Sequence, residues 1–322
     1  MGTLRAAVIG VGYLGNFHAQ KYAALDGVKL AAVVDSDPTR AETIGRQYDA
    51  PWFTDYTQIL DKVDLASIAV PTEHHYEVTR RCLDAGIHVL VEKPITSTVD
   101  EAQDLIDRAR ARGLVFQVGH LERFNPAMLA LQGVITNPLF IESHRIAPFR
   151  PRGTDVNVVL DLMIHDIDNI LQMVPSEIAD IRAVGAPVLT DHVDIANARI
   201  EFANGCVANV TASRVSRDFI RKIRIFQPDS YVSIDYRDHK ILICRKAGFQ
   251  NGATEPNLDI EERTFGKADA LLCEIQAFIN AVRTGTPPVV SGQDGKRALE
   301  VALEISRIAH RAKNADALFA TK

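Results

Sequence analysis

Apolar and polar positions along the first third of the chain follow two alternating periods. Short apolar runs bounded by turn residues are typical of buried strands, and the segments between them repeat their apolar positions with helical spacing. The expected strands are residues 4–9, 28–34, 52–54, 63–70, 89–91 and 114–119. The expected helices begin after Gly15 and cover residues 39–48, 56–60, 75–85 and 99–112. This order predicts a doubly wound parallel sheet with helices on both faces.

The pattern changes from about residue 123. Polar and apolar side chains alternate over residues 140–146, 179–184, 193–202, 206–213, 221–227, 231–235 and 240–245. Helical spacing returns over residues 125–132, 156–173, 268–283 and 295–312. We therefore expect an α/β protein with a parallel-sheet domain over residues 1–122 and an α+β domain with an open, mainly antiparallel sheet over residues 123–322. The carboxy-terminal helix is expected to pack back on the first domain, and the open sheet face favours a homo-oligomer, a dimer or a tetramer.

The first expected strand ends in Gly10-Val11-Gly12-Tyr13-Leu14-Gly15, which matches the pattern G-x-G-x-x-G. Gly10 permits a sharp turn, Gly12 lets a pyrophosphate approach the backbone, and Gly15 lets the helix and the strand pack closely. The helix amino terminus offers N–H groups and a positive dipole end to phosphates, so Tyr13 and Leu14 are further candidates for cofactor contact. The pattern alone also fits any tight turn from a strand to a helix.

Asp35 ends the second expected strand, twenty residues after Gly15. A carboxylate at this interval accepts hydrogen bonds from the ribose of a bound dinucleotide. The two signals together indicate a dinucleotide-binding Rossmann domain. NAD is favoured over NADP, because the same carboxylate would repel a ribose phosphate. Arg40 leaves an alternative open, since its side chain is either solvated or able to meet such a phosphate.

Composition argues against several classes of protein. The 322 residues are 47% hydrophobic and 24% charged, as in soluble globular proteins. The 36 Lys and Arg residues against 41 Asp and Glu residues give a net charge of -5, which disfavours nucleic acid as a partner. Without a bilayer-length apolar stretch or a secretion signal, we expect no membrane partner and a cytoplasmic location. The scattered cysteines suggest neither disulfides nor a zinc site: Cys82, Cys206, Cys244 and Cys273.

The later strands of the parallel sheet end in residues suited to a ligand. Because doubly wound sheets bind ligands at the carboxyl ends of their strands, we expect one crevice to contain Pro71, Thr72, Glu92, Lys93 and His120. His74 and His75 either touch a cofactor or begin a helix. Pro94 biases Lys93 to an extended backbone that points into the crevice. Lys93 is then either a surface lysine or a group near the nicotinamide that assists proton transfer.

The expected helix at residues 156–173 carries Asp161, His165 and Asp168 at i, i+4 and i+7, on one face. The rest of this helix is mainly apolar, so these groups must pair or face a wet cleft. In one interpretation Asp161 and His165 only tie helices together. In the other, Asp161 orients His165, which takes the proton of an alcohol as its carbon loses hydride. A metal site has little support, because no compact set of further His or Cys ligands accompanies this face.

Three arginines precede that helix: Arg145, Arg150 and Arg152. They concentrate positive charge in an acidic protein, and guanidinium groups suit a pyrophosphate. The alternative is a set of surface arginines that pair with acids.

Taken in order, these motifs resemble the Gfo/Idh/MocA oxidoreductases. The resemblance covers nearly the whole chain and rests on Gly10 to Gly15, Asp35, Glu92-Lys93-Pro94, Arg123-Phe124-Asn125-Pro126, the segment from Asp161 to Asp168 and Ser291-Gly292-Gln293-Asp294-Gly295. It implies a Rossmann domain, an open antiparallel sheet domain and a catalytic set of Lys93, Asp161 and His165. Met163 departs from the pattern, because many members have glycine there.

Within that family, residues 119–126, 145–152 and 155–166 resemble the branch that oxidises the 3-hydroxyl of UDP-N-acetylglucosamine. This resemblance implies NAD-dependent oxidation of a sugar-nucleotide hydroxyl to a ketone, with either His165 or Lys93 as the base. It also implies a substrate side made of His120, Arg123, Asn125, Arg145, Arg150, Arg152 and Asp168.

Two other functions fit the same sequence features. One is a cyclitol or free-sugar dehydrogenase on the same scaffold, in which the arginines are incidental. The other is a regulator that binds NAD and a sugar without catalysis. The complete set of Lys93, Asp161 and His165 argues against the regulator, since a sensor needs no proton acceptor.

Overall fold

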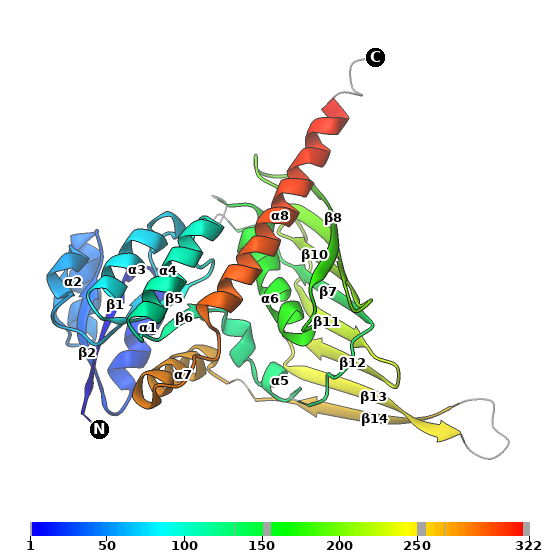
Figure 1. Cartoon of the computed structure of the whole chain (residues 1–322), viewed down its shortest axis with the longest axis horizontal. Coiled ribbons are helices and arrows are strands. Elements are labelled where there is room, and N and C mark those ends of the chain that lie inside the picture. Colours follow the sequence, from blue (N-terminus) through cyan, green and yellow to red (C-terminus); the bar gives the residue numbers. More distant parts are fainter. Residues whose placement is uncertain (1, 132, 151–155, 250–255, 267, 318–322) are drawn as a thin grey trace. The chain divides into compact units, whose positions relative to one another are not determined.

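The computed structural model (Figure 1) describes residues 2–131, 133–150, 156–249, 256–266 and 268–317. Contacts within the chain group it into two compact units. The first contains residues 1–124 and 269–299, and the second contains residues 125–268 and 300–322. The expected boundary at residue 122 placed the whole segment 269–299 in the second domain, whereas its contacts belong to the first unit.

The first unit is built on a six-stranded sheet in the order β3-β2-β1-β4-β5-β6, with every neighbouring pair parallel. Its strands are β1 (Leu4–Ile9), β2 (Val28–Val34), β3 (Trp52–Phe53), β4 (Leu65–Ile68), β5 (His88–Glu92) and β6 (Phe116–Gly119). The order reverses between β1 and β4, so their carboxyl ends form the switch point where doubly wound sheets bind ligands. This confirms the predicted parallel sheet.

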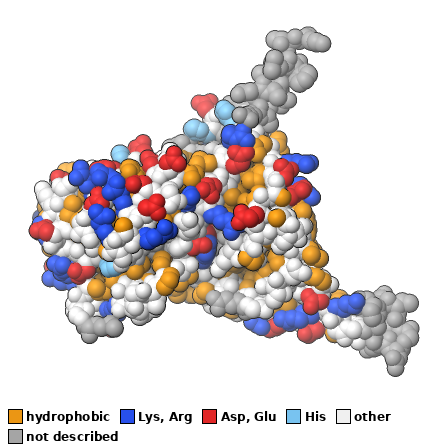
Figure 2. Space-filling model, in the orientation of Figure 1, with side chains coloured by type: hydrophobic (Ala, Val, Ile, Leu, Met, Phe, Trp, Pro, Cys, Tyr) orange, Lys and Arg blue, Asp and Glu red, His pale blue; other side chains and the backbone are white. Residues whose placement is uncertain are grey.

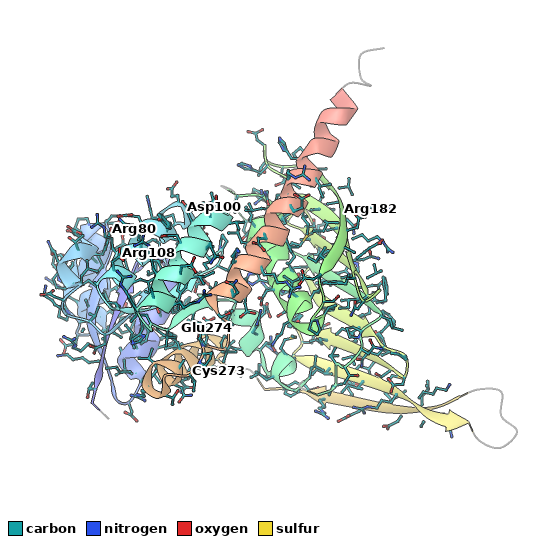
Figure 3. The ribbon with its side chains drawn as sticks, viewed as in Figure 1. Arg80, Asp100, Arg108, Arg182, Cys273 and Glu274 are labelled. Carbon is teal, nitrogen blue, oxygen red and sulfur yellow. The ribbon has the colours of Figure 1, made fainter. Side chains whose placement is uncertain are left out.

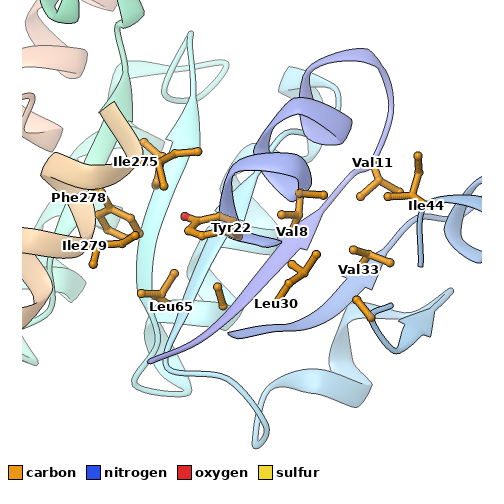
Figure 4. Packing of buried hydrophobic residues seen from close by; sticks show 14 of the residues in the cluster. Val8, Val11, Tyr22, Leu30, Val33, Ile44, Leu65, Ile275, Phe278 and Ile279 are labelled. Atoms are coloured by element: carbon orange, nitrogen blue, oxygen red, sulfur yellow. The ribbon is translucent and has the colours of Figure 1, made fainter. Parts of the chain in front are cut away.

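The helices of the first unit are α1 (Tyr13–Ala24), α2 (Pro38–Gln47), α3 (His75–Asp84), α4 (Val99–Ala111) and α7 (Ala270–Thr284), with the short helices η1 (Tyr56–Ile59), η2 (Thr72–His74) and η3 (Leu121–Phe124). Apolar side chains of α7 enter the same buried cluster as β1 and α1 (Figure 4). Tyr22 and Phe278 are both fully buried there. Burial of large rings dominates the stability of such a core, so α7 is integral to this unit although it lies far along the chain.

The outer surface of α3 and α4 is held by ion pairs. Arg108 bonds Asp104 on its own helix at 2.6 Å and Asp84 on α3 at 3.1 Å. Arg80 of α3 meets the same Asp84 at 3.4 Å, and both arginines project from neighbouring helices in Figure 3. Figure 2 shows basic and acidic side chains beside one another over these helices.

The second unit is built on an eight-stranded sheet in the order β14-β13-β12-β11-β7-β10-β9-β8. Its strands are β7 (Phe140–Ile146), β8 (Ile178–Ala186), β9 (Ile195–Phe202), β10 (Val207–Ser213), β11 (Ile220–Phe226), β12 (Ser230–Asp235), β13 (Lys240–Phe249) and β14 (Pro256–Thr264). Only the pair of β7 and β10 is parallel among these described strands. Buried residues alternate with more accessible ones along β7 and β10, so the sheet has one packed and one open face, as predicted.

The helices of this unit are α5 (Pro126–Leu129), the π-helix η4 (Val159–Met163) and α6 (Ile164–Met173). The last helix, α8 (Gly292–Ala317), begins in the first unit, and its residues from Glu300 belong to the second. Within the described parts of the chain, no helix combines the length and the apolar character needed to cross a membrane.

The sequence pattern did not predict β14. This strand lies at the edge of the sheet, where Leu258 and Ile260 are 57% and 62% exposed and their neighbours are mostly charged. An edge strand with no buried face lacks the period-2 signal of a packed strand. Backbone hydrogen bonds to β13 hold β14 in the sheet, and these bonds leave no pattern of apolar residues in the sequence.

Candidate functional site: the glycine turn, the strand ends and a π-helix

The three glycines of the turn before α1 have distinct environments. Gly10 has a φ of +85°, and an added Cβ would lie 2.7 Å from the backbone of Ala69. A Cβ on Gly15 would lie only 1.8 Å from the carbonyl oxygen of Gly10, whereas one on Gly12 would meet nothing within 4 Å. No side chain caps the amino end of α1. The turn thus presents open backbone at Gly12 beside a free helix end, which suits a pyrophosphate.

Asp35 connects the end of β2 to this turn. Its carboxylate is 6% exposed and accepts hydrogen bonds from the backbone N–H groups of Val11 at 3.0 Å and Asp37 at 3.0 Å. Arg40 donates to both carboxylate oxygens at 3.1 and 3.2 Å. Asp35 therefore stabilises the turn, and its expected contact with a ribose stays a prediction. Arg40, which the sequence left between a solvated residue and a phosphate ligand, is an ion-pair partner of Asp35 in this structure.

The carboxyl ends of β4, β5 and β6 are adjacent in the sheet, which brings Pro71, Thr72, Lys93 and His120 to the same edge. Thr72 begins η2, and Lys93 is half-buried at the end of β5 before a cis Lys93-Pro94 bond. His120 is 1% exposed. These residues lie at one edge of the sheet because the strands that precede them are adjacent and parallel.

His75 begins α3 and holds two of these loops together. Its Nδ1 lies 2.8 Å from the carbonyl oxygen of Pro94, and its Nε2 lies 2.9 Å from that of Val70. Burial lowers the pKa of His75, and the two carbonyl oxygens oppose this shift because they favour a ring that carries a proton on each nitrogen. This side chain is 1% exposed and links the two loops through their carbonyl oxygens, and its expected contact with a cofactor stays a prediction.

Glu92 enters a buried polar group that we call the His18 network, which consists of His18, Tyr22, Ser67 and Glu92. His18 Nε2 lies 2.9 Å from Glu92 Oε1, and its Nδ1 lies 3.1 Å from the hydroxyl of Ser67. Ser67 in turn lies 2.9 Å from the hydroxyl of Tyr22. Burial acts to raise the pKa of Glu92, but the hydrogen bond and charge of His18, with the charge of Lys93, outweigh it and hold that pKa below its usual value. Sequence reasoning missed His18, Tyr22 and Ser67, because they lie inside a helix and a buried strand and belong to no motif.

In the second unit, the segment with Asp161 and His165 is not the continuous α-helix expected over residues 156–173. Residues Val159–Met163 form a π-helix in which Ile164 N–H reaches the carbonyl oxygen of Val159. A π-turn uses i→i+5 bonds, so the i, i+4, i+7 spacing of an α-helix does not describe the whole polar face. Such insertions often occur at functional sites and have no distinctive composition, so the apolar period did not reveal this one.

The polar side chains of this segment differ in exposure. Asp161 and His165 are half-buried, whereas Asp168 is 1% exposed. Met163, which stands where many members of the family have glycine, is fully buried in the π-helix. Asp161 and His165 are therefore more accessible than Asp168 in this structure.

Arg145 does not present a guanidinium to solvent. It lies on β7 and pairs with Asp166 of α6 through two bonds of 2.8 and 3.0 Å, and both side chains are 3% exposed. A guanidinium group that is engaged by a buried carboxylate anchors the helix to the sheet, and the expected substrate role of Arg145 stays a prediction. Arg150 is exposed, and Arg152 lies outside the described residues.

Arg123 and Asn125 are also engaged in the fold. Arg123 is 7% exposed and pairs with Asp294 at 3.4 Å. The side chain of Asn125 accepts the N–H of Ala127 and caps α5. These contacts give Arg123 and Asn125 structural roles, and their expected contacts with a substrate stay predictions.

A second buried ion pair, which the sequence did not indicate, fixes the start of the π-helix segment. Arg214 bonds Asp194 at 2.7 Å and donates to the carbonyl oxygen of Val156 at 2.8 Å. Burial acts to raise the pKa of Asp194, but three backbone N–H groups and Arg214 outweigh it and hold that pKa far below its usual value. Asn157 then caps the segment by accepting the N–H groups of Val159 and Leu160 at 3.0 Å.

The described residues include no cluster of three or more His, Cys, Asp or Glu side chains able to hold a metal ion. What the structure presents is a parallel sheet with a dinucleotide-type glycine turn, and a second sheet that carries a polar π-helix segment. This combination defines a class of protein, the two-domain dinucleotide-binding proteins.

Comparison with known proteins narrows the class to a family. An oxidoreductase family with an NAD-binding Rossmann fold matches residues 4–120, and the GFO/IDH/MocA C-terminal domain matches residues 131–226. The chain is 41% identical over 304 residues to the UDP-N-acetylglucosamine 3-dehydrogenase of Acidithiobacillus ferrooxidans, an alignment that covers 94% of this chain and 96% of that protein. The chain belongs to the Gfo/Idh/MocA oxidoreductases.

Other relatives and solved structures agree with this assignment. The chain is 26% identical to the scyllo-inositol 2-dehydrogenase (NAD(+)) of Bacillus subtilis, with 93% of this chain and 92% of that protein aligned. A solved structure of the Acidithiobacillus ferrooxidans dehydrogenase has a TM-score of 0.89 at 39% identity and covers 96% of this chain and 98% of its own. A levoglucosan dehydrogenase in complex with NADH, with a TM-score of 0.84 at 19% identity over 96% of this chain and 97% of its own, shares the fold.

The glycine turn yields a matched pair of variants. Gly12→Ala is expected to leave the free energy of unfolding within about 0.5 kcal/mol of the wild type, because its methyl group meets no atom, and to weaken NAD binding at least about tenfold. Gly15→Ala is expected to lose about 3 kcal/mol of stability, since its methyl overlaps backbone. Urea denaturation and calorimetric NAD titration measure both. Equal NAD affinity in Gly12→Ala and the wild type would contradict a pyrophosphate at this turn.

The role of Arg145 is testable without any substrate. Arg145→Met is expected to lower the free energy of unfolding by about 3–5 kcal/mol, because it leaves Asp166 buried without its partner. The double variant Arg145→Met/Asp166→Leu is expected to regain most of that loss. Arg199→Met removes an exposed arginine of the same sheet and should cost less than about 1 kcal/mol. If Arg145→Met is as stable as the wild type, the ion pair does not stabilise the fold and a ligand-binding role for Arg145 is favoured.

Proposed function

We propose that this protein oxidises the 3-hydroxyl of UDP-N-acetylglucosamine, or of a similar sugar nucleotide, to a ketone with NAD as the oxidant. The observation that carries the proposal is the 41% identity to the UDP-N-acetylglucosamine 3-dehydrogenase over 94% of the chain. The residues Lys93, Asp161 and His165 support it, because they supply the proton-transfer groups that oxidation of an alcohol needs. A cytoplasmic location is part of the same proposal.

The first unit would hold the cofactor. Gly10, Gly12 and Gly15, with Tyr13 and Leu14 at the start of α1, would receive the pyrophosphate, and Asp35 would receive the adenosine ribose. Further along the sheet edge, the nicotinamide side would be formed by Pro71, Thr72, Glu92 and Lys93. We propose NAD in preference to NADP, because Asp35 is a buried carboxylate fixed at the end of β2.

The reaction assigns separate tasks to the polar residues. Bound NAD would supply the acceptor for the hydride of the carbinol carbon. His165 takes the proton of the hydroxyl, Asp161 orients its imidazole, and Lys93 polarises the oxygen of the developing ketone. His120 and Asp168 would complete the substrate side.

The nucleotide part of the substrate needs cationic partners. Because Arg145 pairs with Asp166, the arginines proposed for the pyrophosphate are Arg150, which is exposed, and Arg152.

The open face of the eight-stranded sheet is our proposed surface for homo-oligomers. It carries an aromatic group in which Phe226 lies 5.8 Å from Phe140 and 5.0 Å from Tyr231 between ring centroids.

Two alternatives remain distinct. The inositol dehydrogenases among the relatives favour a cyclitol or free-sugar dehydrogenase as the second candidate. A regulator that binds NAD and a sugar without catalysis is a candidate of another class, and it would not need the proton-transfer residues.

Turnover separates these candidates. Protein mixed with NAD and UDP-N-acetylglucosamine is expected to produce the absorbance of reduced nicotinamide, with little or none from myo-inositol, scyllo-inositol or glucose, and with NADP a poorer oxidant than NAD. Inositol turnover without UDP-sugar turnover would select the cyclitol dehydrogenase. Absence of turnover with every substrate, despite NAD binding, would select the regulator.

The catalytic assignment predicts different losses for different variants. His165→Asn and Lys93→Met are each expected to lower kcat by about 10²–10⁴-fold, because each removes a proton-transfer or polarising group. In His165→Asn, the acid side of the pH profile of kcat/KM should also lose the ionisation of the base. Arg46→Met, on the exposed face of α2, is the control and should retain full kcat. An unchanged acid limb in His165→Asn would transfer the role of base to Lys93.

A further inference from the structure

Two buried histidines bond the residues on either side of Lys93 in the chain, and the proposed reaction gives neither histidine a task. His18 lies on α1 and His75 begins α3, and each is 1% exposed. A buried ring nitrogen without a hydrogen-bond partner is costly, so polar partners accompany such a ring. The partners of these two rings show what each ring holds in place.

His18 holds the residue before Lys93. Its Nε2 lies 2.9 Å from Oε1 of Glu92, and its Nδ1 lies 3.1 Å from the hydroxyl of Ser67 on β4. Tyr22 is fully buried, and among the described residues its hydroxyl bonds only Ser67. Because a buried hydroxyl needs an acceptor, Tyr22 donates to Ser67 and Ser67 donates to Nδ1. The ring hydrogen is then on Nε2, where it faces Glu92.

His75 holds the residue after Lys93. Its Nδ1 lies 2.8 Å from the carbonyl oxygen of Pro94, and its Nε2 lies 2.9 Å from that of Val70. The bond to Pro94 requires a hydrogen on Nδ1, because a carbonyl oxygen only accepts. Val70 follows β4 and Pro94 follows β5, so this ring, like that of His18, joins the end of β4 to the end of β5.

The two rings come from opposite faces of the sheet. The chain moves from β1 to β2 through α1, and in the opposite direction along the sheet from β4 to β5 through α3. Right-handed crossovers that run in opposite directions place their helices on opposite faces. Leu65, two residues before Ser67, belongs to the apolar cluster of α1 and α7, which agrees with this arrangement (Figure 4). The chain on each side of Lys93 is therefore fixed from a different face.

We propose that His18 and His75 form a clamp on Lys93, in which each ring fixes one chain neighbour of the lysine and both are positioning residues for the reaction. This inference rests on the proposed function, because Lys93 is the group that polarises the ketone. Both histidines act through Lys93, and neither transfers a proton. A displacement of about 1 Å at a catalytic group lowers the rate by about 100-fold, so a fixed backbone here has a direct effect on kcat.

The competing explanation is that the two rings only stabilise the fold. Replacement of either ring would then lower the urea midpoint and leave the kcat of the folded protein unchanged. The nature of the new side chain would matter only through its size and polarity. The clamp makes a different prediction, because it assigns one particular ring nitrogen of each histidine to the neighbour of Lys93.

Asparagine and glutamine separate the two nitrogens. The amide nitrogen of Asn lies near the position of Nδ1, and that of Gln lies near the position of Nε2. His18→Gln therefore keeps a donor for Glu92, whereas His18→Asn loses it. For His75 the order is reversed, because His75→Asn keeps a donor for Pro94 and His75→Gln loses it.

The clamp predicts a crossed pattern of activity with UDP-N-acetylglucosamine and NAD. His18→Asn and His75→Gln are expected to lose about 10–100-fold in kcat, whereas His18→Gln and His75→Asn should stay within about threefold of the wild type. His192→Asn and His192→Gln, which replace an exposed histidine between β8 and β9, are the matched controls and should retain full kcat. A pattern that is not crossed at both histidines overturns the clamp.

Two measurements test the clamp without any substrate. In hydrogen exchange followed by mass spectrometry, peptides that cover residues 88–97 should exchange faster in His18→Asn and His75→Gln than in the wild type, and at the wild-type rate in the other two variants. Nitrogen-15 NMR of the wild type should show a hydrogen on Nε2 of His18 and on Nδ1 of His75, as the two bonds require. This NMR measurement holds even if one of the replacements does not fold. A bare nitrogen at either position overturns the clamp, as does unchanged exchange in folded His18→Asn or His75→Gln.

These results separate the clamp from the proposed function. If the exchange pattern is crossed and both ring hydrogens are found, but no sugar nucleotide is turned over by the wild type, the clamp stands and the proposed substrate fails. If the wild type turns over UDP-N-acetylglucosamine and all four histidine variants have the same kcat, the proposed function stands and the clamp fails.

Discussion

The close approach of α1 to β1 is the constraint on which the first unit depends. A side chain at Gly15 would overlap the carbonyl of Gly10, so helix and strand meet backbone to backbone. This contact fixes the amino end of α1 beside the open backbone of Gly12. It also places His18 and Tyr22 one and two turns further along the helix, where both reach Ser67 of β4. The ligand-facing turn and the buried polar interior thus have a common geometric origin.

Asp35 extends that constraint to the next strand. By accepting the N–H of Val11, it connects the end of β2 to the glycine turn, and by pairing with Arg40 it is also linked to α2. A carboxylate with these partners is both a part of the fold and a candidate ribose ligand. Substitutions at Asp35 will therefore mix an effect on the turn with an effect on the cofactor.

In the second unit, buried ion pairs hold a polar helix segment against a sheet. Its buried ion pairs join Arg145 to Asp166 and Arg214 to Asp194, with both members of each pair almost fully buried. Buried pairs add little net stability over apolar side chains, but breaking one is costly, so they favour a single arrangement. In this unit they fix the start of the π-helix segment and its continuation in α6. The half-buried Asp161 and His165 lie between these two anchors in the sequence.

Hydrophobic periodicity and the spacing of a few motif residues determined much of this protein in advance. The strands at residues 4–9, 28–34 and 140–146 were predicted to the residue, and the alternation of strands and helices predicted the parallel sheet. The family followed from a series of motifs along the chain that includes the glycine turn, Asp35 and Lys93. These features are local, because a strand period or a tight turn is written in consecutive residues. The tertiary structure alone decided that α7 belongs to the first unit, that Arg145 is a buried anchor, that residues 159–163 form a π-helix and that Glu274 is fully buried. Each of these depends on which distant side chains become neighbours and on how much water they lose, and neither quantity is contained in a local pattern.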